Sequence, residues 1–382
     1  MKKTDTVSTS LLIWTIVLTN LTQMPQLISS GINSYITLAC WGGLFLYAVL
    51  NGKLCIQITK FPAFIYAAVF LCYALAMQVF TERIYLGTAL VYPYLLSVFV
   101  FLVGCLYSNV YNKIDIQKLY IAYIVSGIIV AISVFFDAFS EGFSWFSRVY
   151  TYESKNSVSQ IILTVVLLLV FADAGKKIPQ IIKTITAILL IVLMGMLKSR
   201  ASLVGVLVII IYILLSRKIN KGLKILTFMI TVSFVIAVYF NPTLNEIVID
   251  GIIFAGRSAE NLNDFSSGRV DMFGDFSANF SDWWAFGRGI YYLEAFPISL
   301  LMQYGIFGSA PIILYLILPF TIIYRMKYTA NKPLIIAILI CYYANGLFEE
   351  LSPLGPGVKC YLLWFLLGLE AVKPKRNSLR NH

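Results

Sequence analysis

The residues best suited to chemistry gather in one polar stretch, residues 241–295, of an otherwise apolar chain. Within it, SSGRVDMFGDFSANFSDWWAFGRGI (residues 266–290) combines arginines, acids, glycines and aromatic residues more densely than the rest of the sequence. Arginine side chains bind phosphate and carboxylate groups through charge-assisted hydrogen bonds. If the protein carries out chemistry on an anionic substrate, the reacting groups are expected in this stretch or at helix ends that face it.

A short helix is predicted inside this stretch from Gly268 to Phe280, with Ser266 or Ser267 as its N-cap residue. Arg269 then lies in the first turn, where free backbone amides and a guanidinium group can together hold phosphate oxygens. The alternative is an ion pair between Arg269 and Asp271 or Asp275 on a solvated face. One face of the helix is predicted to be apolar, with Val270, Phe273, Phe276 or Ser277, and Phe280. An amphipathic helix is also predicted over residues 244–255, ending at Gly256.

A second candidate site is the short turn in MLKSRASLVG, residues 196–205, between two apolar segments. Lys198 and Arg200 stand there on the side of the membrane that is otherwise poor in cations, beside Ser199 and Ser202. One interpretation is that both cations extend to lipid headgroups. A pair of cations on the unfavoured side favours instead an anionic ligand at the interface, with phosphate as the first candidate.

The third candidate is GRGIYYLEAFPISLLMQYGIFG, residues 287–308, in which glycines flank Arg288 and Glu294 stands at the entry to a span. Glu294 is either an interfacial carboxylate paired with an arginine or a general base. Gly305 and Gly308 would let this span pack closely against a neighbour. The aromatic residues around Arg288 either stack on sugar rings or anchor the chain in the membrane interface. They are Trp283, Trp284, Tyr291 and Tyr292.

The elements that must position these residues are those of a membrane protein. Of the 382 residues, 59% are hydrophobic and 12% are charged, whereas soluble domains carry about 25% charge. A helical span needs about 17–25 residues, mostly apolar. The predicted fold class is an all-α polytopic membrane protein with twelve transmembrane helices, forming one membrane domain over residues 1–382. The predicted spans are residues 11–28, 34–50, 61–80, 88–107, 119–139, 158–173, 180–197, 200–215, 224–240, 297–324, 333–349 and 357–372.

The distribution of charge sets the predicted orientation. With cytoplasmic termini, 20 of the 29 Lys and Arg residues fall on the inner side, and the loop 241–295 between spans nine and ten lies outside. The formal charge of +11 is then an orientation signal facing anionic lipid, which argues against a nucleic-acid partner. The first span shows no cleavage site for a signal peptide and is predicted to be retained. The single histidine, His382, is the last residue, so no histidine-dependent metal site and no cofactor are predicted.

The order of these motifs resembles the O-antigen polymerase and O-antigen ligase superfamily. An SR-containing turn between spans, an outer loop with SGR and then GxG, and the EAFPISLLMQYGIFG entry into the next span follow one another over about residues 180–325. The resemblance implies that an undecaprenyl-diphosphate-linked glycan binds at the outer face of the inner membrane. A sugar hydroxyl then attacks its anomeric carbon without a metal ion or nucleotide sugar. It further implies that Arg200 and Arg269 hold the diphosphate. From the residues themselves we add Lys198 to this role, Arg288 to substrate binding and Glu294 as candidate base.

Ligases of that superfamily usually carry a histidine shortly before the LLMQYGIFG-like stretch, where this chain has Glu294. We therefore expect the polymerase branch, an enzyme that joins lipid-linked repeat units of O-antigen, capsule or a related surface polysaccharide. Two alternatives stay open: a ligase that transfers glycan to a lipid A core, and a flippase that moves the lipid-linked unit without bond chemistry. The expected partners are the lipid-linked oligosaccharide, membrane lipids and a chain-length regulator protein.

Overall fold

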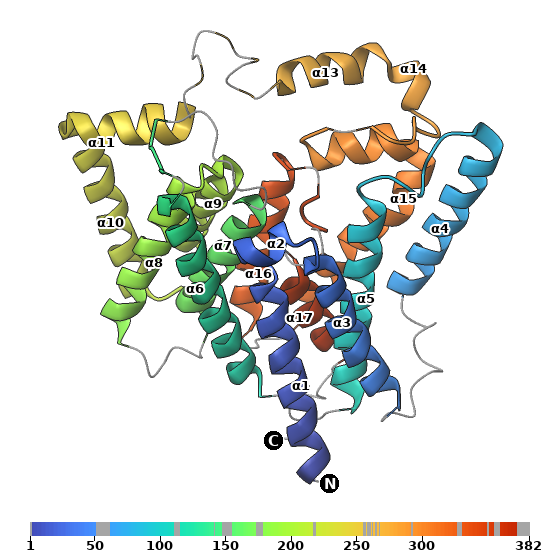
Figure 1. The fold of residues 1–382 in the computed structure, drawn as a ribbon, viewed down its shortest axis with the longest axis horizontal. Coiled ribbons are helices and arrows are strands. Elements are labelled where there is room, and N and C mark those ends of the chain that lie inside the picture. The colour runs from blue at the N-terminus through green and yellow to red at the C-terminus, as the bar shows by residue number, and fades with distance from the viewer. Residues whose placement is uncertain are drawn as a thin grey trace, which may run out of the picture.

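A computed structural model of the chain shows an all-α protein in the residues that it describes. These are residues 2–50, 62–110, 115–140, 142–146, 155–172, 179–216, 219–254, 257, 261, 263, 266, 268–291, 293–326, 331–349, 351–354 and 360–372. Apolar helices run side by side as a bundle, and shorter helices cross one end of it (Figure 1).

Each predicted span overlaps an apolar helix of the described chain, although the bounds differ and two of the spans are interrupted. Among these helices, α3, α4, α5, α6, α10 and α15 are long and apolar enough to cross a membrane. The others are shorter apolar helices, so the membrane class is supported while the count of twelve spans remains a prediction. The bounds are α1 (Lys2–Leu21), α3 (Asn33–Leu50), α4 (Pro62–Thr81), α5 (Val91–Val110), α6 (Ile116–Ser140), α7 (Lys155–Phe171), α8 (Gln180–Met196), α9 (Arg200–Leu215), α10 (Lys221–Phe240), α15 (Phe296–Arg325), α16 (Lys332–Gly346) and α17 (Tyr361–Ala371).

The first predicted span, residues 11–28, is not one helix. Helix α1 ends at Leu21, and a separate short helix α2 (Pro25–Ser29) follows with Pro25 in its first turn. Proline has no amide hydrogen and its ring clashes with the carbonyl four residues earlier, so α1 cannot continue through Pro25. The buried Asn20 near the end of α1 donates a 2.9 Å hydrogen bond to Ser126 Oγ of α6, which fixes the end of the helix in the bundle.

The centre of the bundle is formed by α5 and α17. Their backbones approach closely at Gly104 and Gly368, because a methyl group on Gly368 would lie 2.1 Å from the carbonyl oxygen of Phe101. Small residues allow such close packing of membrane helices. Helices α4 and α10 stand at opposite sides of the bundle in Figure 1, and α10 buries none of its side chains. These outer helices leave large apolar side chains for contact with lipid.

The predicted outer loop, residues 241–295, crosses the end of the bundle opposite to the start of α1 (Figure 1). It contains α11 (Pro242–Glu246), a π-helix η3 (Ile247–Phe254), α13 (Arg269–Ala278) and α14 (Phe280–Trp283). The helix predicted over residues 244–255 is therefore confirmed for its described part. The second predicted helix is confirmed too, and Arg269 is its first residue.

The predicted apolar face of that second helix is mostly exposed and only its Phe276 packs inward. Val270, Phe273 and Phe280 are exposed, whereas Met272 and Phe276 pack against a small core of Trp283, Leu293 and Met302. Helical spacing allows two neighbouring apolar stripes here. The contact with Trp283 and the start of α15 decides which one faces inward.

Helix α15 is broken at Gly305, which the prediction of a single span over residues 297–324 did not include. Gly305 has φ 63° and ψ −173°, a conformation that side chains with a Cβ atom rarely adopt. The part before the break runs across the end of the bundle, and the part after it runs along the bundle (Figure 1). Gly308 packs against α4, since a methyl group there would lie 2.1 Å from the Tyr73 ring. The predicted close packing of this span is confirmed at Gly308.

The GxG motif, residues 287–289, lies beside the segment of α15 that contains the break at Gly305. Gly287 and Gly289 have φ values of 76° and 80°, and a methyl group on Gly287 would lie 2.3 Å from the carbonyl oxygen of Gln303. Backbone hydrogen bonds join residues 284–289 to residues 302–307, for example Arg288 N to Met302 O at 2.7 Å and Ile306 N to Trp284 O at 2.8 Å. These backbone hydrogen bonds hold together both ends of the intervening segment, which includes Glu294.

Candidate functional site

Charged side chains from distant parts of the chain meet at the end of the bundle crossed by α13. Lys155 begins α7, Lys198 and Arg200 flank the turn between α8 and α9, and Arg257 and Arg269 come from the 241–295 loop. Lys155 interacts with the charges of Arg200, Arg257, Glu294 before α15 and Glu349 after α16. Arg200 also interacts with Arg257, Arg269 and Glu294, and Lys198 interacts with Lys155. We call this group of five cations and two carboxylates the cation cluster.

The turn between α8 and α9 holds Lys198 in an uncommon position. Lys198 has φ 52°, in the left-handed region, and its side chain is only 6% exposed. That conformation costs a residue with a Cβ atom about 1–2 kcal/mol. Burial, and then the charge of Lys155, lower the pKa of the Lys198 amine. A strained and partly desolvated cation indicates a functional demand on this turn.

Serine hydroxyls and an asparagine fix the same turn. Ser199 Oγ lies within hydrogen-bond distance of two oxygens, Ser202 Oγ at 3.0 Å and Asn156 Oδ1 of α7 at 3.3 Å. Ser199 and Ser202 are buried. The two serines noted beside the cations in the sequence therefore tie the turn to α7, next to Lys155.

Arg200 is the first residue of α9 and lies among charges of both signs. It interacts with the like charges of Arg257 and Arg269 and with the opposite charge of Glu294. The structure thus brings together Arg200, Arg269, Lys198 and Glu294, four of the residues that the sequence singled out. Three arginines so close together repel one another unless an anion compensates them.

Arg269 is held by four hydrogen bonds. Its Nη2 lies 2.7 Å from Glu294 Oε2 and 2.8 Å from Phe348 O, Nη1 lies 2.9 Å from Ser266 O, and Nε lies 3.3 Å from Glu294 O. The interpretation that Arg269 pairs with Asp271 or Asp275 is wrong. Its ion pair with Glu294 joins α13 to the start of α15, and the bond to Phe348 reaches the end of α16.

The N-terminus of α13 has two of its amides, those of Val270 and Asp271, already bonded to side chains, which weakens the predicted helix-end site. Val270 N donates to Ser266 Oγ at 3.3 Å, and Asp271 N donates to Asn263 Oδ1 at 3.2 Å. Ser266 thus caps the helix as predicted, although Gly268 occupies the N-cap position itself. Ser267, the other predicted cap, lies outside the described residues. Anion binding by Arg269 must therefore rest on its guanidinium group.

Arg288 and Tyr291 belong to a separate polar group. Arg288 Nη2 lies 3.0 Å from Asp282 Oδ2, and its guanidinium carbon lies 5.8 Å from the centre of the Tyr291 ring. The Tyr291 hydroxyl donates to Asp275, and this hydrogen bond, followed by burial, raises the pKa of Tyr291. These contacts are local to the α13–α15 region and include no residue of the cation cluster.

The predicted sugar-stacking residues divide into two kinds. Trp283 is only 3% exposed, stacks on Phe276 at 4.3 Å and donates from Nε1 to Phe276 O, so it is a core residue and the stacking role is wrong for it. Trp284 is 45% exposed and keeps an accessible ring. Tyr292 lies outside the described residues.

Sequence reasoning did not assign Lys155, Arg257 and Glu349 to the site. Lys155 and Arg257 both fall on the predicted outer side, but neither has a local motif that sets it apart. They join the cluster only through packing of α7 and the 241–295 loop beside the α8–α9 turn. The one signal in the sequence that pointed to both Lys155 and Arg257 was their positive charge on the predicted outer side, where cations are few.

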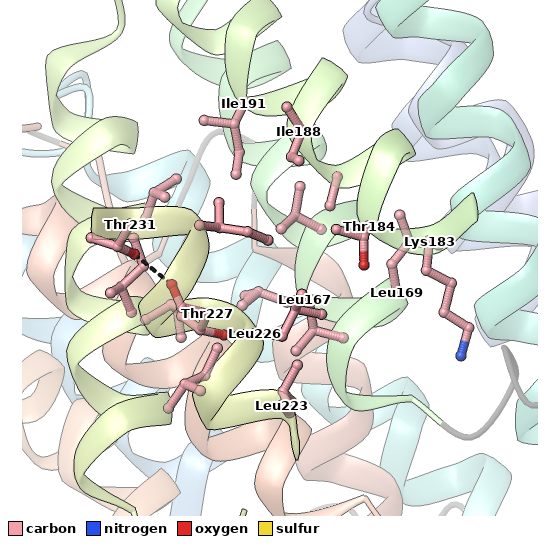
Figure 2. Close-up of a pocket in the computed structure, with 18 of the residues that line it drawn as sticks. Leu167, Leu169, Lys183, Thr184, Ile188, Ile191, Leu223, Leu226, Thr227 and Thr231 are labelled. Atoms are coloured by element: carbon pink, nitrogen blue, oxygen red, sulfur yellow. Dashed lines mark hydrogen bonds between the residues drawn. The ribbon is translucent and has the colours of Figure 1, made fainter. Parts of the chain in front are cut away.

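An apolar cavity of about 140 Å³ lies elsewhere, between α7, α8, α9 and α10 (Figure 2). It is lined mainly by the first halves of α8 and α10 and by the second halves of α7 and α9, away from the ends of α7, α8 and α9 that carry the cluster. Thr231 Oγ1 donates to Thr227 O within α10, so that hydroxyl is satisfied inside its own helix. The cavity is thus no part of the cation cluster.

Comparison of the chain with protein-family models and with curated proteins found no match, so the candidate site rests on its own geometry.

Proposed function

We propose that this protein polymerises lipid-linked oligosaccharide repeat units, using undecaprenyl-diphosphate-linked donors at the outer face of the cytoplasmic membrane. The observation that carries the proposal is the cation cluster, where cations from three parts of the chain meet at one end of an apolar helical bundle. A lipid diphosphate carries its negative charge at the membrane interface, directly beside an apolar tail. The cluster matches that arrangement, because it lies where the helices end.

In the proposed reaction the non-reducing-end hydroxyl of an incoming unit attacks C1 of the growing glycan. The hydroxyl oxygen bonds to C1 while the bond from C1 to the diphosphate breaks, and its electron pair leaves with undecaprenyl diphosphate. Lys198 and Arg200 neutralise the charge that develops on the leaving group, and Glu294 accepts the hydroxyl proton. The protein thus contributes mainly alignment and electrostatic stabilisation.

Other residues have supporting roles in this proposal. Lys155 and Arg257 add positive charge to the diphosphate site. The backbone hydrogen bonds between residues 284–289 and 302–307 fix the loop that carries Glu294. Trp284 is the exposed aromatic side chain from the predicted set that remains available to stack on a sugar. A flippase is less well supported, since its charges are expected along a central cavity and not at one end of the bundle.

The decisive experiment supplies purified full-length protein with undecaprenyl-diphosphate-linked repeat units alone, without lipid A core, divalent metal or nucleotide sugar. A polymerase finds both donor and acceptor in this one substrate and should produce a ladder of longer lipid-linked glycans. If folded protein gives no ladder and transfers glycan only after a lipid A core is added, it is a ligase. Movement of the lipid-linked unit across vesicles without new bonds would identify a flippase.

The proposed orientation has its own test. Reporter fusions at Lys221, at the start of α10, and at Asn263, in the 241–295 loop, should report opposite sides of the membrane, with Asn263 outside. Reporters on the same side would contradict both the topology and the location of the active face.

A further inference from the structure

The hydrogen bonds of Arg269 differ in kind. Three of them go to the backbone carbonyl oxygens of Ser266, Glu294 and Phe348, and one goes to the side-chain oxygen Oε2 of Glu294. The backbone acceptors are fixed by the fold and orient the guanidinium group. The carboxylate is the one acceptor that can leave by a side-chain rotation.

The surroundings of this ion pair favour exchange of one anion for another. The Arg269 side chain is 19% exposed and that of Glu294 is 37% exposed, so the carboxylate lies on the open side of the pair. Glu294 also interacts with Lys155 and Arg200. A carboxylate and a phosphate oxygen bind a guanidinium group in the same way, and the more highly charged phosphate binds more strongly among several cations.

We propose that Glu294 and the diphosphate of the substrate compete for Arg269, so that diphosphate binding releases the Glu294 carboxylate. The inference rests on the proposed function for its substrate, a lipid-linked diphosphate. Arg269 then binds a phosphate oxygen through Nη2 while its backbone contacts persist. The released carboxylate stays within reach of the cluster and becomes available to take a proton.

This exchange orders the proposed reaction. Before the diphosphate binds, the Glu294 oxygen that would accept the proton is occupied by Arg269. After exchange, Glu294 Oε2 accepts the proton of the acceptor hydroxyl, the hydroxyl oxygen bonds to C1, and the C1–O bond breaks with its electron pair on the diphosphate. Binding of the diphosphate thus both frees the Glu294 base and fills the leaving-group site. The acceptor hydroxyl is therefore activated only when a donor is bound.

The test measures binding of farnesyl diphosphate to purified full-length protein, beside the ladder assay. Glu294→Gln keeps the shape of the side chain but replaces a charged competitor by a neutral one, so it should bind the diphosphate about tenfold more tightly, which corresponds to about 1.4 kcal/mol. The matched control is Asp282→Asn, which removes the carboxylate paired with Arg288 in the same loop and should leave affinity unchanged. In an Arg269→Gln background, Glu294→Gln should lose its effect, because the contested partner is gone.

The outcomes separate this inference from the proposed function. Tighter binding by Glu294→Gln supports the exchange even if the wild-type protein forms no ladder, in which case the polymerase is rejected. A wild-type ladder together with unchanged or weaker binding by Glu294→Gln rejects the exchange and keeps the polymerase. If Glu294→Gln does not fold, Glu294→Asp retracts the carboxylate by one methylene. It should then also bind more tightly than wild type, and weaker binding would overturn the exchange.

Discussion

Arg269 and Arg288 come from the same loop, each beside a glycine, yet the structure gives them different surroundings. Arg288 pairs with Asp282, whose side chain is 57% exposed, and lies over the Tyr291 ring. Arg269 is fixed by three backbone carbonyls, pairs with Glu294 and lies beside the charges of Arg200. The glycines differ as well. Gly268 starts a helix, whereas Gly287 allows the backbone of Gln303 to approach and Gly289 allows the backbone of Ile84 to approach.

A guanidinium group in a glycine-rich motif therefore does not by itself define a phosphate site. An exposed ion pair contributes about 0–1 kcal/mol and tolerates loss of a partner. Five cations around two carboxylates form a site with more positive than negative charge among the residues that define it. Variants of the two regions should therefore differ strongly in their effects.

The largest effect is expected from Arg200→Ala. It should abolish polymer while protein level and single repeat units remain, because charge-assisted bonds to the diphosphate worth about 1.5–3 kcal/mol each are lost. Arg200→Lys should restore polymer only in part, since lysine lacks the planar fork of donors. Polymer length on gels, with protein level from blots of the same membranes, measures both. Wild-type polymer from Arg200→Ala would remove this residue from the site.

Glu294→Gln should come next and slow the ladder by about 10²–10⁴-fold, the usual contribution of general acid–base catalysis. Substrate binding should not weaken, so the loss should appear in the turnover rate. Rates at saturating lipid-linked substrate measure it. A small loss confined to binding would mean that Glu294 only pairs with Arg269.

Lys198→Gly should lower polymer formation about tenfold and stabilise the protein, because the charge is lost and glycine adopts the left-handed backbone without a penalty of about 1–2 kcal/mol. The midpoint of thermal unfolding should rise by a few degrees. Lys198→Asn is the matched variant, since asparagine also lacks the charge but relieves less strain. It should lose as much polymer with a smaller rise in midpoint. Equal stability of Lys198→Gly and wild type would argue that the turn stores no strain.

The smallest effect is expected from Arg288→Ala, which should change the ladder rate by less than about threefold, as for an exposed ion pair. The same purified-protein assay measures it beside Arg200→Ala. If Arg288→Ala removed as much activity as Arg200→Ala, the distinction between the two regions would fail and Arg288 would belong to the site.

The apolar segments of the sequence determined much of the architecture, because a run of apolar residues in a bilayer has to satisfy its backbone hydrogen bonds within a helix. The helices inside the 241–295 loop followed from their spacing in the same way, including the place of Arg269. Lys198 and Arg200 were also singled out from sequence, since they fall on the predicted outer side, where cations are few. All of these inferences depend on neighbours in the chain.

Tertiary structure decided what lies beside these residues. The partner of Arg269 is Glu294 and not the nearer Asp271, and its bond to Phe348 spans 79 residues of sequence. Ser199 meets Asn156 across 43 residues. Burial of Trp283 against Phe276, and the break of α15 at Gly305 against Ala285, depend on how the loop folds back on the bundle. Local periodicity fixes which residues form a helix, but a charge or an aromatic ring has several partners within reach, and only packing of distant segments selects one of them.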